Sequence, residues 1–209
     1  MQIYLDNAAT TRISPAALRA MLPCLEEHYG NPSSLYAFGQ DARERLERAR
    51  AQIAARLHCE AKEVYFTSGG SEADNQALRS AARIGAAKGK RHIVSTAFEH
   101  HAVLHTLDRL REEGFEVTLL DVHGDGLVRP AEVAAAIRPD TCLVSVMYAN
   151  NEIGTIQPVA EIGRICRERA SCSTPTRSRR PGICPSTCRS RTSTCSRSRP
   201  TSSTGRGAR

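Results

Sequence analysis

The chain has 209 residues and a formal net charge of +7 at neutral pH. Residues 171–209 carry 9 Arg and no Lys, Asp or Glu, which leaves 20 basic and 22 acidic side chains in residues 1–170. The larger part of the chain is therefore mildly acidic, and its charge argues against a nucleic-acid-binding module.

The sequence also gives expectations about the cellular location. No apolar stretch approaches the length of a membrane span, and the N-terminus lacks a basic region followed by an apolar one. The first four cysteines have no paired spacing, and no set of His, Cys and carboxylate residues has zinc-site spacing. We expect a cytoplasmic protein without a membrane segment, a disulfide framework or a metal site.

In chain order, the spacing of apolar residues predicts an alternation of helices and strands. Helices are expected where apolar residues recur every three to four positions, and strands where short apolar runs occur. The predicted helices cover 15–29, 39–57, 72–85, 100–113, 130–137 and 158–168, and the predicted strands cover 64–67, 92–95, 115–120 and 142–147. Strands separated by helices indicate an α/β fold with a mostly parallel sheet and right-handed crossovers.

Ligands bind at the carboxyl ends of the strands in such sheets. Three segments are expected there: 68–75, 97–101 and 148–154. In the first, Gly69, Gly70 and Ser71 come before a helix, where free N–H groups favour an anion such as phosphate. The alternative is an ordinary glycine turn with Ser71 as helix cap.

The other two segments have alternatives as well. His100 could stack on an aromatic ring, move protons or bind a metal, although most isolated histidines do none of these, and His101, His105 and His123 are expected to be surface or packing residues. Asn150, Asn151 and Glu152 could orient a polar ligand, or they could simply terminate a loop.

Taken together, five motifs in order resemble group I (NifS/IscS-type) cysteine desulfurases. They are Tyr4-Leu5-Asp6-Asn7-Ala8-Ala9-Thr10-Thr11, Tyr29-Gly30-Asn31-Pro32-Ser33-Ser34, Phe66-Thr67-Ser68-Gly69-Gly70-Ser71-Glu72-Ala73-Asp74-Asn75, Glu99-His100-His101-Ala102-Val103-Leu104 and Asn150-Asn151-Glu152-Ile153-Gly154. The resemblance covers roughly the first 170 residues, which is under half of a full-length member. It implies an α/β fold, the large domain of a fold-type I PLP-dependent transferase, of which residues 1–170 are the N-terminal part.

Function and site residues follow from the resemblance. The cofactor would be pyridoxal 5'-phosphate, with Gly70 and Ser71 on its phosphate, His100 stacked on its ring and Asn151 near its phenolic oxygen and the substrate carboxylate. The substrate would be L-cysteine, and its sulfur would pass to an iron–sulfur scaffold or another acceptor protein. Intact members of the family are homodimers.

The resemblance stops near Arg169 and Ala170. The family continues with an aspartate for the ring nitrogen, a glutamine for the phenolic oxygen and the Schiff-base lysine, and residues 171–209 contain none of these motifs. Lys62, Lys88 and Lys90 lie in helical or loop stretches away from the three candidate segments. We therefore expect the chain as given to be an inactive, truncated form.

The segment 171–209 has a composition of its own. It contains 10 Ser, 7 Thr and 4 Cys, with Ile183 as its only large aliphatic residue, so we expect a disordered Ser/Arg-rich tail. Codons can be chosen for Cys172–Arg180 and Ser198–Gly205 that, read two bases on, encode Phe-His-Thr-Asp-Ala-Val-Gln-Ala and Ser-Ala-His-Lys-Phe-His-Gly. Both missing motifs return in one frame and in family order, so we hypothesise a frameshifted desulfurase gene.

Two other classes of function stay open on the sequence. One is a sister activity on the same scaffold, selenocysteine lyase or another class V aminotransferase. The other is a non-catalytic fragment that dimerises with an intact paralogue or binds RNA through its Arg/Ser-rich tail. The tail lacks aromatic side chains on which bases could stack, and the spacing of Cys172, Cys184, Cys188 and Cys195 matches no common zinc site.

Overall fold

The computed structural model describes residues 3–7 and 9–171. The segment predicted to be a disordered, frameshifted tail lies outside the described residues, apart from Ser171. The described chain divides into two compact units, one ending at Phe66 and one beginning at Thr67. None of the described helices is both long and apolar enough to span a membrane.

The first unit is built from helices α1 (Pro15–Glu26) and α2 (Ala37–Leu57) and a short 3-10 helix, η1 (Ala61–Glu63). Helix α1 begins where the Ser14 hydroxyl accepts the Ala17 N–H, with Pro15 in the first turn. It ends three residues earlier than predicted, because the N–H groups of Glu27 and His28 both bond to the Pro23 carbonyl. Helix α2 begins two residues earlier than predicted and ends at Leu57 as predicted.

The strand predicted at 64–67 was wrong. A strand needs a neighbour for its ladder, and the sheet of the described chain pairs only β1 with β2 and β1 with β3. Val64 and Phe66 instead contact α2, where the Arg50 guanidinium donates to the Val64 carbonyl and lies 5.0 Å from the ring centroid of Phe66. Val64 has the extended backbone that the apolar run predicts, but the run does not pair as a strand.

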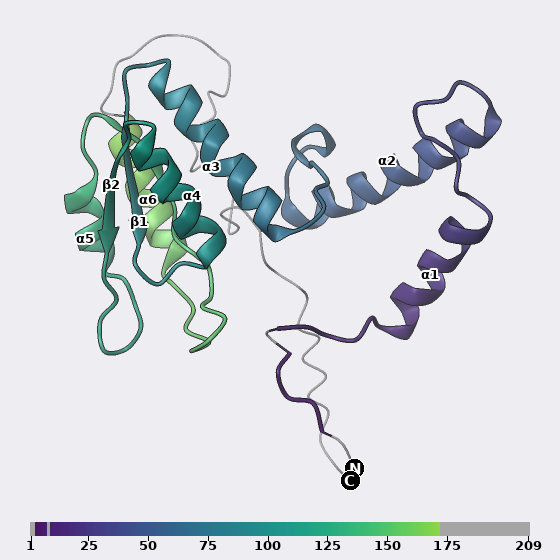
Figure 1. The fold of residues 1–209 in the computed structure, drawn as a ribbon, viewed down its shortest axis with the longest axis horizontal. Helices are drawn as coiled ribbons and strands as arrows, with labels where there is room; N and C mark the ends of the chain where they lie inside the picture. Colours follow the sequence, from purple (N-terminus) through teal and green to yellow (C-terminus); the bar gives the residue numbers. More distant parts are fainter. Residues whose placement is uncertain (1–2, 8, 172–209) are drawn as a thin grey trace. The chain divides into compact units, whose positions relative to one another are not determined.

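The second unit is a three-stranded parallel sheet flanked by helices (Figure 1). Its elements are α3 (Gly70–Ala86), β1 (His92–Thr96), α4 (His101–Glu112), β2 (Glu116–Leu120), α5 (Pro130–Ala136), β3 (Thr141–Val144) and α6 (Val159–Ser171). The strand order is β2-β1-β3, and β1 pairs in parallel with both of its neighbours. The predicted α/β alternation with a parallel sheet is therefore confirmed. Strand β3 is shorter than predicted, since ladder pairing ends at Val144.

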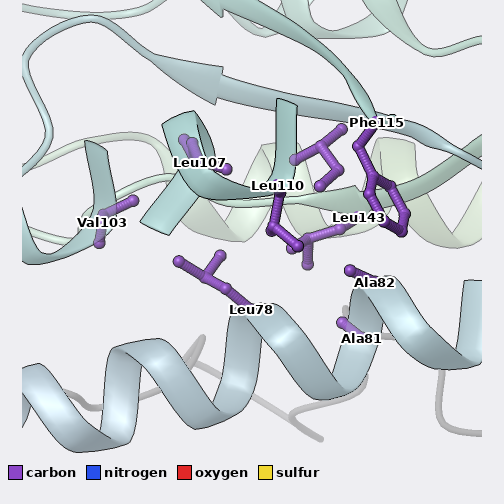
Figure 2. Packing of buried hydrophobic residues seen from close by; sticks show 9 residues of the cluster. Leu78, Ala81, Ala82, Val103, Leu107, Leu110, Phe115 and Leu143 are labelled. Carbon is purple, nitrogen blue, oxygen red and sulfur yellow. The ribbon is translucent and has the colours of Figure 1, made fainter. Parts of the chain in front are cut away.

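Each face of the sheet has its own apolar cluster. Between the sheet and helices α3 and α4, Leu78 and Ala82 point toward Leu110 and Leu143, as Figure 2 shows. Helices α5 and α6 cover the other face. The cluster there has four buried residues: Val128, which precedes α5, and Val133, Ile162 and Cys166 on the two helices. The alternation of side chains along the strands supplies both clusters, which makes the second unit a three-layer structure.

Two contacts set the sheet and helix spacing. His92, fully buried in the central strand, forms hydrogen bonds with the hydroxyls of Thr141 at 2.7 Å and Thr118 at 2.9 Å, one on each neighbouring strand. Gly85 allows α3 to approach β3, because a Cβ at this position would lie 2.3 Å from the Cβ of Cys142. These contacts hold the three strands together and set the distance between α3 and the sheet, the elements that position the candidate site.

Candidate functional site

The carboxyl ends of the three strands meet at one edge of the sheet, because the strands are parallel. Residues 97–101 follow β1 directly, and the loop 148–154 follows β3 after three more residues. Two of the three segments predicted at this edge are therefore confirmed there. The third, 68–75, follows no strand, and α3 begins within it at Gly70.

The first turn of α3 presents backbone N–H groups that have no acceptor inside the helix. Gly69 precedes it with extended backbone, and a Cβ at Gly69 would meet no atom within 4 Å, so the space beside it is open. The Glu72 carboxylate accepts the N–H and the hydroxyl of Ser68 at 2.7 and 2.6 Å, which lowers the pKa of Glu72. Gly70 and Ser71 are the next residues on this turn, and Ser71 is exposed.

His100 is the N-cap of α4. Its Nδ1 accepts the backbone N–H of Ala102 at 3.0 Å, which fixes the ring orientation. An accepting nitrogen carries no proton, so in the neutral ring the proton is on Nε2. The His100 and His101 rings lie edge to face with centroids 6.0 Å apart.

Ser71 and His100 lie in one open groove of about 460 Å³ between α3 and α4. The other lining residues are Asn75, His101, Ala102, His105, Thr106 and Arg109. The structure therefore brings together two of the four predicted site residues, although they lie far apart in the sequence. His101 and His105 are exposed, as predicted, and their stacked rings also line this groove.

Two lining residues of this groove, Asn75 and Thr106, connect the helices. The buried Thr106 hydroxyl donates to the Asn75 side-chain oxygen at 2.8 Å, and the Asn75 amide donates to the Ser71 carbonyl at 2.8 Å. Neither residue was predicted as a site residue from the sequence. Asn75 lies in the predicted phosphate segment and Thr106 on the apolar side of α4, so only tertiary contact reveals their link.

Asn151 is exposed in the turn after Asn150, and neither it nor Gly70 lines the groove between α3 and α4. The neighbouring Asn150 is bound on several sides. Its side-chain oxygen accepts the N–H groups of Glu152 and Ile153 at 2.8 and 3.0 Å, and its amide donates to the Phe98 carbonyl at 3.2 Å. Asn150 is therefore the structural member of the pair, and Asn151 is the member open to a ligand.

Glu99 is a residue of this edge that sequence reasoning left without a role. Its side chain is 8% exposed, and its carboxyl group accepts the Met147 N–H at 2.6 Å. Burial raises the pKa of Glu99 to about 7, with a further contribution from the negative charge of Asp74. A carboxyl group after a strand gives no sequence signal that it is turned inward, since Glu residues are mostly exposed.

Comparison with known proteins gives the chain a family. The model of the aminotransferase class-V family matches residues 3–174. The chain is 49% identical over 168 residues to cysteine desulfurase IscS of Clostridium botulinum (strain Kyoto / Type A2), covering 80% of this chain and 42% of that protein.

Two solved structures extend the likeness to the fold. A NifS-like protein matches with a TM-score of 0.79 and 40% identity, over 82% of this chain and 47% of that one. SspA in complex with cysteine matches with a TM-score of 0.76 and 35% identity, over 80% of this chain and 48% of that one. The chain thus spans less than half the length of these relatives, and it belongs to the aminotransferase class-V family.

Proposed function

We propose that residues 1–170 are the N-terminal part of the cofactor-binding domain of a cysteine desulfurase, and that Gly70, Ser71, His100 and Asn151 bind pyridoxal 5'-phosphate. The observation that carries this proposal is the shared groove, in which the Ser71 hydroxyl and the His100 ring lie together at the start of α3 and α4. The desulfurase names among the relatives support the reaction class.

The residues present suit this cofactor. A phosphate group would bind the N–H groups at the start of α3 and the Ser71 hydroxyl, since a helix N-terminus favours an anion. The open space beside Gly69 allows close approach of such a group to the backbone. An aromatic ring attached to that phosphate would stack on His100, which is held by its bond to the Ala102 N–H.

When bound, the cofactor supplies an electron sink for the carbon that carries the substrate amine. This chain would contribute orientation and a proton path. With Nδ1 occupied by the Ala102 N–H, Nε2 of His100 is the atom at which a proton would be donated or accepted. The exposed Asn151 amide could bind the phenolic oxygen of the ring and the carboxylate of the substrate.

L-cysteine is the proposed substrate, and alanine and a transferable sulfur are the proposed products. The likeness to SspA in complex with cysteine supports this substrate class. An iron–sulfur scaffold or another acceptor protein would receive the sulfur, and the intact protein would be a homodimer in the cytoplasm. These parts of the proposal rest on the family.

The 209-residue polypeptide by itself is not expected to turn over cysteine. Its three lysines are Lys62, Lys88 and Lys90. Lys62 is exposed and paired with Glu60 at 2.6 Å, and Lys88 and Lys90 follow the far end of α3. At 1.5 Å per helical residue, the length of α3 places them roughly 25 Å from Ser71, out of reach of a ring over His100.

Calorimetric titration with pyridoxal 5'-phosphate tests the proposal. We expect saturable binding that weakens about tenfold in His100→Ala and in Ser71→Ala, because each loses one stacking or hydrogen-bond contact. His123→Ala is the matched control, since His123 pairs with Glu132 and lies outside the groove. Binding that is equally strong in all four proteins would contradict the assignment.

A phosphate-free analogue separates the two halves of the site. Pyridoxal without its phosphate should bind more weakly to the unmodified chain and should be insensitive to Ser71→Ala. It should remain sensitive to His100→Ala. Alanine and sulfide formed from L-cysteine by the 209-residue chain, and lost in His100→Ala, would overturn the expectation of inactivity.

A further inference from the structure

Two loops at the carboxyl edge of the sheet hold each other by side chains that reach in opposite directions. From the loop after β1, the Glu99 carboxyl group accepts the N–H of Met147 at 2.6 Å. From the loop after β3, the Asn150 amide donates to the carbonyl of Phe98 at 3.2 Å. We call this pair of contacts the Glu99–Asn150 clasp.

Each member of the clasp is itself fixed. Glu99 is 8% exposed and also receives a long hydrogen bond from the Thr96 hydroxyl at 3.5 Å. The Asn150 N–H donates to the Thr155 carbonyl at 3.1 Å, and the Asn150 carbonyl accepts the N–H of Gly154 at 3.0 Å. The cross-loop contacts therefore join two rigid anchors rather than two free side chains.

The chemistry of Asn150 shows that the clasp is more than a turn. A turn of this kind needs only the side-chain oxygen, which here accepts from Glu152 and Ile153, and an aspartate would serve equally well. The Nδ2 group is the part that crosses to the other loop. The same group also lies 3.5 Å from the Met147 Sδ in its own loop, but its shorter hydrogen bond is the one to the Phe98 carbonyl, and the turn itself does not use it.

Each member of the clasp also directly precedes a candidate site residue, Glu99 before His100 and Asn150 before Asn151. We propose that Glu99 and Asn150 are positioning residues whose reciprocal contacts hold His100 and Asn151 at a fixed separation, so that both act on one ligand. The identity of that ligand, pyridoxal 5'-phosphate, rests on the proposed function, whereas the contacts themselves belong to this chain.

The acceptor role of Glu99 does not require its charge. A protonated carboxyl group keeps a carbonyl oxygen for the Met147 N–H, and so does the amide of Glu99→Gln. Burial keeps Glu99 largely neutral below about pH 7. Glu99→Gln is therefore the conservative variant that should retain the clasp, and Glu99→Ala removes it.

Nuclear magnetic resonance of the full 209-residue chain tests the clasp without any ligand. In Glu99→Ala, hydrogen exchange at the Met147 amide should become about tenfold faster, and the resonances of Asn151 on the opposite loop should shift. Glu99→Gln should keep the slow Met147 exchange and the Asn151 resonances of the unmodified chain. If the Asn151 resonances do not shift in Glu99→Ala although the Met147 amide exchanges faster, the loops are independent and the proposal is wrong.

Asn150→Asp gives the reciprocal test, and it remains informative if Glu99→Ala fails to fold. The aspartate keeps the oxygen that accepts from Glu152 and Ile153 but loses the donor to the Phe98 carbonyl and to the Met147 sulfur, so the turn should stay protected while the His100 ring resonances move. Asn31→Asp is the matched control, because Asn31 uses its side-chain oxygen for the Ser33 N–H at 3.0 Å within its own loop. Unchanged His100 resonances in Asn150→Asp would overturn the proposal.

Titration with pyridoxal 5'-phosphate adds the link to the ligand. Asn150→Asp should bind about tenfold more weakly than the unmodified chain, and Glu99→Gln about equally. Equal binding by Asn150→Asp, despite shifted His100 resonances, would show that the separation does not matter to the ligand and would overturn the positioning role. If the unmodified chain binds no cofactor, the proposed function fails, and the ligand-free resonances still decide whether the clasp exists.

Discussion

The backbone N–H of Met147 donates a 2.6 Å hydrogen bond to the buried carboxyl group of Glu99, joining the ends of β1 and β3. Because burial raises the pKa of Glu99 from 4.5 to about 7, the folded chain holds its proton more tightly than the unfolded chain does. The contribution of the protonated Glu99 carboxyl group to the free energy of unfolding is complete below pH 4.5 and is lost as the pH rises through about 7. The loss amounts to about 3 kcal/mol.

Glu99→Gln should remove this pH dependence. Urea unfolding between pH 4.5 and 8 should show a smaller decline in unfolding free energy for Glu99→Gln than for the unmodified chain, with the variant the more stable at pH 8. The surface variant Glu113→Gln, whose carboxylate pairs with Arg79 at 3.0 Å, should keep the original slope. Parallel curves for the unmodified chain and Glu99→Gln would contradict the protonated, buried state of Glu99.

His92 should act in the opposite direction. Burial and the nearby Arg138 guanidinium lower the pKa of His92 below 6.5, so the unfolded chain binds its proton more readily. Stability from His92 is present above pH 6.5 and is lost as the pH falls below that value. His92→Gln, with a neutral side chain, should show less acid destabilisation below pH 6.5 in the same experiment, and a steeper acid loss would contradict this role.

Gly85→Ala should destabilise the chain by about 1–3 kcal/mol, because the added Cβ would lie 2.3 Å from the Cβ and 2.9 Å from the Sγ of Cys142. Gly163→Ala in α6 is the control. A Cβ there would meet only the Arg167 guanidinium at 3.6 Å, so the variant should gain about 0.5–1 kcal/mol from helix propensity. Equal effects of the two variants in thermal unfolding would show that α3 does not pack closely on β3.

Thr106→Val tests the link between α3 and α4. The variant keeps the shape of the side chain but removes the hydroxyl that donates to Asn75, and it leaves the Asn75 oxygen without this donor. We expect a loss of about 1–2 kcal/mol in unfolding free energy, together with a shift of the Ser71 resonances, since Asn75 also bonds the Ser71 carbonyl. A stability loss without any change at Ser71 would show that the link does not reach the candidate site.

The sequence predicts the elements of the second unit well because their signals are local. Leu78 and Ala82 on α3, and Leu107 and Leu110 on α4, recur at helical spacing and are buried as that spacing implies. The strand at 64–67 could not be judged locally, because the run Val64-Tyr65-Phe66 suits a strand and the presence of a pairing neighbour is a property of the whole fold.

The residues of the candidate site also differ in whether their sequence signal is local. Ser71 and His100 stand out in the sequence because a glycine turn and a strand-end histidine are local patterns. Glu99 and Thr106 do not, since their roles depend on Met147 and Asn75, partners far away in the chain. Asn150 and Asn151 look equivalent in sequence, and the contacts of the Asn150 side chain with Glu152, Ile153 and Phe98 distinguish the anchoring residue from the exposed one.

We propose that the composition of residues 171–209 arises from a shift of reading frame within a desulfurase gene. Sequencing of the gene and its transcript from codon 160 onward should show that one inserted or deleted base near codon 170 restores the aspartate, glutamine and lysine motifs of the family. Reads that encode the present segment and contain no such motifs in any frame would contradict this origin.

The central claim is that Ser71 and His100 bind the same molecule of pyridoxal 5'-phosphate, and resonance shifts on titration test it most directly. The backbone amides of Gly70 and Ser71 and the ring of His100 should shift together along curves with a single dissociation constant, while His123 stays unchanged. Separate dissociation constants at Ser71 and His100, or shifts at neither, would show that the groove between α3 and α4 is not a cofactor site.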